Sequence, residues 1–311
     1  MRRLERLERL PGEGEVWLKD DGVFGGAWGG NKARKLEWIL PDVRRRRRKT
    51  ILTFGALATN HGLATALYAG EREIRTVLAL VDQPLDDHVA RQSTRIERSG
   101  ACVHRTRGTV RTIAALPYLY ARYTDWRGLR PPYFLTVGGS SALGALGYVD
   151  AALELAVQVE QGDLPEPSHV LVALGSGGTA AGLVLGLGIA GLRTRVVAVQ
   201  VNDRMPLDPA RVARLARRAR RLLERRGARI GTGPISAGDL RVEGRWLGAG
   251  YGHRTPEADN AIGVARDEGI ALEPVYTGKT MAALLALREL RELAAGPLLY
   301  WHTHNALQES R

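Results

Sequence analysis

Short apolar runs alternate along most of the chain with longer segments in which apolar residues recur at helical spacing. Continuous runs of Val, Leu, Ile and Ala are typical of strands that are buried on both faces of a sheet. These runs predict strands at 50–54, 76–81, 133–137, 170–174, 196–201 and 298–301, with helices at about 60–68, 88–99 and 148–161. Because strands and helices alternate, we expect an α/β fold with helices covering parallel sheets.

The apolar run that ends at Leu174 is followed by a glycine-rich turn, and apolar residues then resume at 180–190. The turn consists of Gly175, Ser176, Gly177, Gly178 and Thr179. Glycines can adopt a positive φ and leave N–H groups uncovered, and a helix start favours a negative charge. We expect this turn to bind a phosphate; a close-packed corner without a ligand is the alternative. A nucleotide is not indicated, because the P-loop lysine and the G-x-G-x-x-G spacing are missing.

Other strand ends also carry small or polar residues, at 55–60, 137–141 and 302–305. In parallel sheets flanked by helices, ligands bind beyond the carboxyl ends of the strands. We therefore expect the functional residues to come from these segments and from 175–179.

Residues 170–192 carry no charge, and one helix of that length would cross a bilayer. Glycines in its middle would break such a helix and leave backbone groups unpaired in lipid, so we expect no membrane partner. The chain starts with charged residues and no apolar segment follows them, which favours a cytoplasmic protein.

The composition is that of a globular protein of one or two domains, with 311 residues of which 44% are hydrophobic. Cys102 is the single cysteine, which excludes a disulfide framework and a thiolate metal cluster. The histidines show no metal-ligand spacing with carboxylates, so no metal site is expected.

The net charge of +12 raises the question of nucleic-acid binding, with basic segments at 44–49 and 211–226 as candidates. The second segment predicts an amphipathic helix whose arginines lie on the outer face. No aromatic residues interleave with the arginines as stacking platforms. We therefore expect a solvated charged surface and no nucleic-acid partner.

The five lysines limit any chemistry that needs an amine: Lys19, Lys32, Lys35, Lys49 and Lys279. An amine attacks a carbonyl only when it is deprotonated, and burial or neighbouring cations favour that state. Lys32 follows two glycines at the start of a helical pattern, next to Arg34 and Lys35. This position makes Lys32 a candidate nucleophile, although lysines near helix starts are mostly surface residues.

Six motifs occur together and in a characteristic order: GGNKARKLEWIL, TFGALATNHGLATALYA, VGGSSALGALGYV, ALGSGGTAAGL, LEPVYTGKTM and WHTHNAL. With these motifs the chain resembles the pyridoxal 5'-phosphate (PLP) enzymes of the D-cysteine desulfhydrase and 1-aminocyclopropane-1-carboxylate (ACC) deaminase family. The resemblance covers about residues 15–307.

The resemblance implies the α/β architecture called fold type II, similar to the tryptophan synthase β subunit. In this fold two α/β domains contain parallel sheets and PLP lies in the cleft between them. The large PLP-binding domain would comprise residues 1–35 and 146–311, and the small inserted domain residues 36–145. The resemblance also implies a homodimer.

The resemblance further implies which residues bind the cofactor. Lys32 would form the Schiff base with PLP, and Gly175, Ser176, Gly177, Gly178 and Thr179 would hold the phosphate. Asn60 would hydrogen-bond the ring hydroxyl. Thr303 would be the hydroxyl partner of the pyridine nitrogen, with Thr277 as a second possibility.

For the substrate, a small amino acid, the resemblance implies that Thr59, Asn60 and His61 form the turn that holds the carboxylate. Ser140 would be a further substrate contact, and Tyr276 would lie beside the substrate. The candidate catalytic residues are Lys32, Thr59 and Tyr276.

The sequence departs from the family pattern at four positions in or beside these motifs. Thr59 replaces a serine, Ser141 an asparagine, and His304 with Asn305 a pair of glycines. The expected activity is β-elimination, as in D-cysteine desulfhydrase, which yields a 2-oxo acid and, by hydrolysis, ammonia. Alternatives are ACC deaminase, a hydrolase activity, another β-substituted amino acid lyase, a racemase, or a PLP-binding pseudoenzyme.

Overall fold

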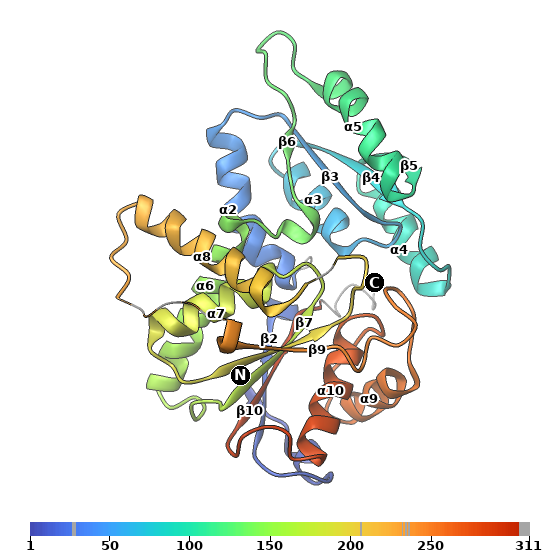
Figure 1. The fold of residues 1–311 in the computed structure, drawn as a ribbon. Helices are drawn as coiled ribbons and strands as arrows, with labels where there is room; N and C mark the ends of the chain where they lie inside the picture. Colours follow the sequence, from blue (N-terminus) through green and yellow to red (C-terminus); the bar gives the residue numbers. More distant parts are fainter. Residues whose placement is uncertain (27–28, 206, 232, 234, 236, 305–311) are drawn as a thin grey trace. The chain divides into compact units, whose positions relative to one another are not determined.

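The computed structural model describes residues 1–311 except 27–28, 206, 232, 234, 236 and 305–311 (Figure 1). The chain divides into two compact units. The large unit consists of Met1–Arg34 and Ser141–Arg311, and the small unit is the inserted segment Lys35–Ser140. The domain limits implied by the resemblance, after residues 35 and 145, lie close to these.

A six-stranded sheet forms the centre of the large unit, in the order β1–β2–β10–β7–β8–β9 (Figure 1). All neighbouring strands are parallel except β1 and β2. The register places His302 opposite Asp20 and Leu174 opposite Gln200, so these carboxyl ends meet at one edge of the sheet. The strands are β1 (Arg2–Arg3), β2 (Val16–Asp20), β7 (His169–Leu174), β8 (Arg195–Gln200), β9 (Leu240–Glu243) and β10 (Leu298–His302).

Helices cover both faces of this sheet, as predicted (Figure 1). Val170 and Val172 of β7 pack with α6, α7 and α8, whereas Leu171 between them packs with α1, α9 and α10. Successive side chains of a strand point to opposite faces, so an uninterrupted apolar run supplies both cores. The helices are α1 (Glu5–Glu8), α6 (Ala142–Glu160), α7 (Gly178–Ala190), α8 (Pro209–Arg225), α9 (Pro256–Asp267) and α10 (Thr277–Glu289).

The small unit contains a parallel four-stranded sheet in the order β5–β4–β3–β6. Its strands are β3 (Thr50–Ala56), β4 (Arg75–Val81), β5 (Cys102–Arg107) and β6 (Tyr133–Phe134). Its helices are α3 (Asn60–Gly70), α4 (Asp87–Arg98) and α5 (Thr109–Tyr123), and α2 (Asn31–Arg45) begins in the large unit and continues into this one. Short 3₁₀ turns are η1 (Asp21–Val23), η3 (Val137–Gly139) and η4 (Ala237–Asp239).

The predicted strand at 133–137 was too long, because β6 ends at Phe134 and η3 follows. Gly138 and Gly139 have φ values of 64° and 65°, which a strand cannot accommodate. The next helix starts at Ala142, well before the predicted residue 148. Ser141 caps this helix by accepting the Gly144 N–H at 3.0 Å, so Gly144 belongs to the first turn of this helix.

Residues 170–192 do not form one helix, as expected: β7, the 175–177 turn and α7 divide them. Among the described residues, α6 is a helix with the length and composition of a membrane span. It packs closely on α7, where a side chain at Gly182 would collide with the Ala145 carbonyl and with Tyr148. Core helices of globular proteins share these properties.

Candidate active site

Lys32 lies in the first turn of α2, directly after Asn31, the first residue of that helix. The Asn31 N–H donates to the Thr303 carbonyl at 3.1 Å, and its side-chain amide donates to Thr179 Oγ1 at 3.5 Å. Lys32 Nζ donates to Asn31 Oδ1 at 2.7 Å. Asn31 thus connects three predicted cofactor-binding positions within the large unit. Sequence reasoning gave Asn31 no role; the available signal was its place beside the candidate lysine.

Burial lowers the pKa of the Lys32 amine to about 8, against the opposing attraction of Glu273. A pKa this low leaves an appreciable fraction of the amine unprotonated near neutral pH. The other lysines donate to carboxylates or to backbone carbonyls: Lys19 to Glu154, Lys49 to Asp125, Lys35 to Gly138, and Lys279 to Leu247 and Gly250. The structure therefore favours Lys32 as the nucleophilic amine.

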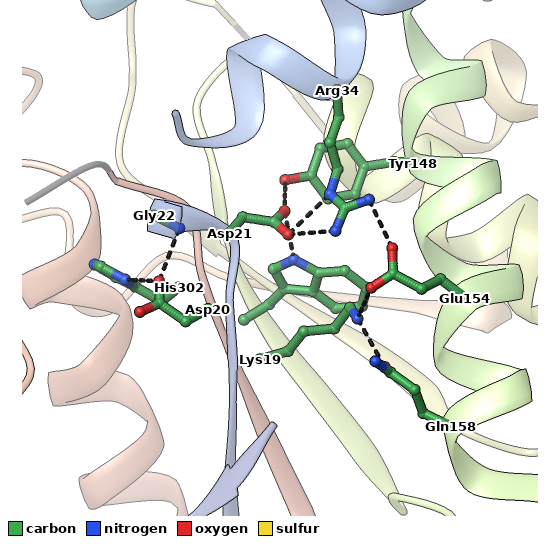
Figure 2. Close-up of polar contacts among 10 residues, drawn as sticks. Lys19, Asp20, Asp21, Gly22, Arg34, Tyr148, Glu154, Gln158 and His302 are labelled. Carbon is green, nitrogen blue, oxygen red and sulfur yellow. Dashed lines mark hydrogen bonds and ion pairs between the residues drawn. The ribbon is translucent and has the colours of Figure 1, made fainter. Parts of the chain in front are cut away.

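A buried group of hydrogen bonds centred on Asp21 holds the chain on either side of Lys32 (Figure 2). The Asp21 carboxylate accepts from Arg34 Nε at 2.8 Å, from the Tyr148 hydroxyl at 2.5 Å and from the Trp301 indole at 2.7 Å. The Asp21 carbonyl accepts the Gly30 N–H at 2.9 Å. The backbone two residues before Lys32 and the side chain two residues after it are thus fixed to one buried residue.

Glu154 completes the charge balance of this group (Figure 2). It accepts from Arg34 at 2.9 Å and from Lys19 at 2.5 Å, so two carboxylates face two cations. Buried charges are costly unless they are paired and hydrogen-bonded. Removing one charged side chain would leave its partner without an opposite charge. The paired charges therefore hold the start of α2 in a single arrangement.

The 175–179 turn leaves the start of α7 without a side-chain cap. Gly177 is the residue that precedes the helix; its φ is 85° and it offers no side-chain acceptor. The first N–H groups of an α-helix have no partners within the helix, and an anion can satisfy them. The Gly175 carbonyl points elsewhere, since it accepts the Asn202 side-chain amide at 3.1 Å. This geometry suits a phosphate, and phosphate binding by the turn stays a prediction.

Tyr276 lies against this turn, because a Cβ atom at Gly175 would come within 3.0 Å of the Tyr276 ring. Its hydroxyl is 2.8 Å from the hydroxyl of Tyr251. Burial, together with Tyr251 and Glu273, raises the pKa of Tyr276 well above its usual value. The Tyr276 hydroxyl is therefore protonated at neutral pH and can donate a hydrogen bond.

Tyr251 was not predicted as a site residue. It lies in a glycine-rich loop, Gly248–Gly252, and the loop is held by Lys279, whose fully buried side chain donates to the carbonyls of Leu247 and Gly250. The glycines gave a signal for a loop, but the pairing with Tyr276 joins residues that only the fold brings together.

Glu273 fixes the turn that carries Tyr276 and Thr277. Its buried carboxylate accepts the backbone N–H of Val275, Tyr276 and Thr277 at 2.9, 2.8 and 2.6 Å. The Thr277 hydroxyl lies 3.1 Å from the same carboxylate and 3.2 Å from the Glu273 carbonyl. Because this hydroxyl has acceptors within its own turn, Thr303 is the better candidate for the pyridine nitrogen.

Thr303 follows β10 directly and is buried. The preceding residue, His302, pairs through Nδ1 with Asp20 Oδ1 at 2.7 Å, and Asp20 also accepts the Gly22 N–H at 2.7 Å (Figure 2). His304 is half-buried, and a Cβ at Gly22 would lie 2.6 Å from its carbonyl oxygen. Asn305, the other departure in this segment, lies outside the described residues.

In the small unit, Thr59 is the residue that precedes α3, and its hydroxyl accepts the Gly62 N–H at 3.1 Å. As the acceptor in that bond, the hydroxyl keeps its own hydrogen to donate. The Thr59 methyl group, which was expected beside the substrate carboxylate, packs on Gly55 and Gly62 of its own turn. The substitution of threonine for serine thus adds a contact within the turn.

Asn60 and His61 begin α3 and make different contacts. The buried His61 ring lies with Nε2 3.3 Å from the Thr53 hydroxyl of β3. Asn60 Oδ1 accepts from Gln92 Nε2 at 2.7 Å. Gln92 belongs to α4 and was not singled out from the sequence.

Ser140 is the last residue of the small unit and directly follows η3, which packs beside α3. The structure therefore brings Thr59, Asn60, His61 and Ser140 to adjoining segments of the small unit. Within the large unit it joins Lys32, the 175–179 turn, Tyr276 and Thr303 through Asn31, Gly175 and the Asp21 group. Thr59 follows the end of β3, Gly175 that of β7 and Thr303 that of β10, so these residues lie next to the carboxyl ends of parallel strands.

The large-unit residues fit PLP on structural grounds. An aldehyde needs an amine that loses its proton easily, and the pKa of Lys32 is lowered to about 8. A phosphate needs several N–H donors, and the α7 start has a glycine, with no side-chain acceptor, at the capping position. Thr303 carries a hydroxyl, and its backbone carbonyl is bonded to the Asn31 N–H. Lys32, the 175–179 turn and Thr303 would thus hold the cofactor.

Comparisons with known proteins agree with this chemistry. The family model described as "Pyridoxal-phosphate dependent enzyme" matches residues 1–304. The chain is 34% identical over 310 residues to a D-cysteine desulfhydrase of Salmonella paratyphi A. The aligned region covers 97% of this chain and 90% of the relative.

Among solved structures, an ACC deaminase homologue is similar with a TM-score of 0.80 and 29% identity, over 98% of this chain and 88% of that one. A PLP-dependent aspartate racemase shares the fold, with a TM-score of 0.66 and 17% identity over 98% of this chain and 89% of that one. The fold is therefore fold type II, as the resemblance implied. The chain belongs to the family of pyridoxal-phosphate dependent enzymes and is a PLP-dependent lyase or deaminase.

Proposed function

We propose that this enzyme acts as a D-cysteine desulfhydrase, removing the β-substituent of a small amino acid and releasing a 2-oxo acid and ammonia. The observation that carries the proposal is the 34% identity with an enzyme of that name over 97% of the chain. Thr277 supports it, because this position carries a glutamate in the ACC deaminase pattern. The one nearby carboxylate described above, Glu273, already accepts three backbone N–H groups.

When bound, PLP supplies an electron sink for the amino acid. Lys32 Nζ would hold the cofactor and would act as the base that takes the α-proton of the substrate. The Thr59–His61 turn orients the substrate carboxylate. Tyr276, whose hydroxyl is protonated at neutral pH and lies 2.8 Å from the Tyr251 hydroxyl, is the candidate hydrogen-bond donor to the substrate. A hydroxyl at Thr303 beside the pyridine nitrogen would leave that nitrogen largely unprotonated, which would suit a reaction with a good leaving group.

A second candidate function is ACC deaminase, favoured by the TM-score of 0.80 with a structure described as a homologue of that enzyme. Opening a cyclopropane ring draws harder on the electron sink. A hydroxyl in place of a carboxylate near the ring nitrogen therefore disfavours it. Another β-substituted amino acid lyase, a racemase and a pseudoenzyme rank lower.

We further propose that the enzyme is a homodimer, as the resemblance implies, and that it is cytoplasmic, which the single cysteine favours. Exposed apolar residues in the small unit support a protein contact: Val110 is 80% exposed, Ile113 61%, Trp126 65% and Leu129 77%. Light scattering after size exclusion measures the mass, and a monomer would contradict this part of the proposal.

A substrate panel tests the activity. Purified holoenzyme is given D-cysteine, L-cysteine, D-serine and ACC in turn, and 2-oxo acid, ammonia and sulfide are measured. We expect kcat/KM to be highest for D-cysteine, with equal amounts of the three products. A higher value for ACC would establish the second candidate, and turnover of none of them would favour the pseudoenzyme.

Replacing the lysine tests the assignment of the amine. Lys32→Ala should abolish the visible absorbance of bound PLP, the pyridoxyl adduct formed with borohydride, and turnover. Lys49→Ala is the matched control, because the Lys49 side chain is 72% exposed and pairs with Asp125. A Lys32→Ala protein that kept the borohydride adduct at another lysine would end this assignment.

A further inference from the structure

The helix α4 (Asp87–Arg98) belongs to the small unit (Figure 1). Gln92 is a buried polar residue of this helix. Val89, Gln92 and Ile96 are the buried residues of this helix, at 2%, 3% and 1% exposure. Their spacing places them on one face, and the two apolar residues pack with Leu57, Leu63, Leu78 and Leu80. An apolar residue at position 92 would continue this stripe.

The buried amide of Gln92 has a hydrogen-bonding partner that explains it. Gln92 Nε2 donates to Asn60 Oδ1 at 2.7 Å, which joins α4 to the first residue of α3. Burying an amide is unfavourable unless it is hydrogen-bonded. The bond satisfies one end of each of the two side chains.

The hydrogen bond from Gln92 determines whether the Asn60 amide offers its oxygen or its NH₂ group to a second partner. An asparagine side chain has an acceptor oxygen and a donor NH₂ group, and the two can exchange places by rotation of the amide. With Oδ1 held by Gln92, Nδ2 is the end left to donate. An ionised ring oxygen of PLP is an acceptor, so it requires the donor end.

We propose that Gln92 is a positioning residue that orients the Asn60 amide with its NH₂ group toward the ring oxygen of PLP. The proposal rests on the role proposed for Asn60 in cofactor binding. A hydrogen bond to the ionised form of a group favours that form and lowers its pKa. Gln92 would therefore act through Asn60 to keep the bound cofactor in the form with an ionised ring oxygen.

The test is a pH titration of the visible absorbance of the holoenzyme in a double-mutant cycle. The four proteins are wild type, Gln92→Met, Asn60→Ala and the double variant. Methionine has a similar size and suits the apolar stripe, so the fold should be retained, and thermal unfolding checks this. We expect Gln92→Met to raise the apparent pKa of the absorbance change by about half a unit to one unit.

Asn60→Ala should raise this apparent pKa at least as much as Gln92→Met does. The double variant should have the same apparent pKa as Asn60→Ala, because Gln92 acts through Asn60. Gln92→Glu extends the test: a carboxylate accepts only, so the Asn60 amide must turn its NH₂ group toward residue 92. This variant should give a larger rise than Gln92→Met.

Three results would overturn the proposal. They are an unchanged pKa in Gln92→Met, an unchanged pKa in Asn60→Ala, or an equal shift from Gln92→Met with and without Asn60. A purely structural role would appear as a lower unfolding temperature with no shift in the titration. The outcome is separate from that of the substrate panel, because a holoenzyme that turns over a different amino acid still gives a titration.

Discussion

Two turns of this chain follow a parallel strand and begin a helix, yet they satisfy the start of that helix differently. In the small unit, Thr59 caps α3 with its hydroxyl, which accepts the Gly62 N–H at 3.1 Å. In the large unit, Gly177 precedes α7 with a φ of 85° and has no side chain to offer. Side-chain oxygens at this position usually accept one of the N–H groups that the helix leaves unpaired.

The difference teaches how to recognise a ligand-binding turn without seeing the ligand. A turn that caps its own helix has fewer donors for an anion, whereas a glycine cap leaves the donors and the helix dipole to an outside group. We therefore expect the 175–179 turn to be the one that binds the phosphate. The Thr59 turn is left to offer the remaining hydroxyl hydrogen and N–H groups to a carboxylate.

The largest expected effect comes from placing a negative charge in the large-unit turn, by Ser176→Asp. Two unit charges about 4 Å apart near a protein surface repel by about 4 kcal/mol, so PLP affinity should fall on the order of 100-fold or more. Pyridoxine 5'-phosphate, which lacks the aldehyde, should weaken similarly in isothermal calorimetry. The fold should be unaffected, because an acidic residue near a helix start is favourable by about 0.3–1 kcal/mol.

Ser176→Asn is the neutral control of similar size, and its affinity should stay within a few-fold of wild type. Pyridoxal, which lacks the phosphate, provides a second control, since its binding should change little in either variant. Equal losses for pyridoxal and for its phosphate ester would show that the turn does not hold the phosphate, and the comparison between the two turns would lose its basis.

The second prediction uses pH to separate phosphate binding by the turn from formation of the covalent bond between Lys32 and PLP. Burial lowers the pKa of Lys32 to about 8, so the amine is protonated below that pH and unprotonated above it. The rate at which apoenzyme attaches PLP should rise about tenfold per pH unit below 8 and level off above it. An ordinary lysine, with a pKa of about 10.4, would give a rate that rises until pH 10. Stopped-flow absorbance measures this rate.

Binding of pyridoxine 5'-phosphate should stay nearly constant between about pH 7 and 9, since the second pKa of a phosphate ester is about 6. A flat binding curve beside a rising attachment rate would assign the phosphate to the turn and the pH dependence to Lys32. A rate that continued to rise to pH 10 would contradict the lowered pKa.

Much of the fold could be predicted because buried parallel strands are apolar along their whole length. The strands at the centres of both sheets, β7 and β3, were predicted within a few residues. β2, β5 and β9 were not, since each carries charged residues. In β2, Lys19 is buried because Glu154 and Gln158, far away in the sequence, accept its hydrogen bonds.

The site shows the same limit. Lys32 and the 175–179 turn could be found from local sequence, because few lysines exist and the turn is glycine-rich. Glu273 and Gln92 could not be found in this way, because the role of a buried Glu or Gln depends on hydrogen-bonding partners that the sequence does not reveal. Glu273 caps a turn within its own segment, and Gln92 contacts Asn60 across 32 positions of sequence.

The smallest expected effect concerns the cap in the small unit. Thr59→Ala removes the oxygen that accepts the Gly62 N–H, and loss of a helix cap costs about 1 kcal/mol of unfolding free energy. Thr59→Ser keeps the oxygen and loses only the methyl group that packs on Gly55 and Gly62, so it should change that free energy by less than about 0.5 kcal/mol. Urea unfolding of the two apo variants measures the difference.

Activity of the same two variants sharpens the comparison between the turns. The Thr59 methyl group packs within its own turn, so Thr59→Ser should leave KM for the amino acid within about twofold of wild type. Thr59→Ala should raise KM, because it removes a hydroxyl hydrogen bond worth about 0.5–1.5 kcal/mol. If Thr59→Ser instead changed KM severalfold with unfolding unaltered, the methyl group would face the substrate. The turn would then be shaped for its ligand as closely as the glycine turn of the large unit.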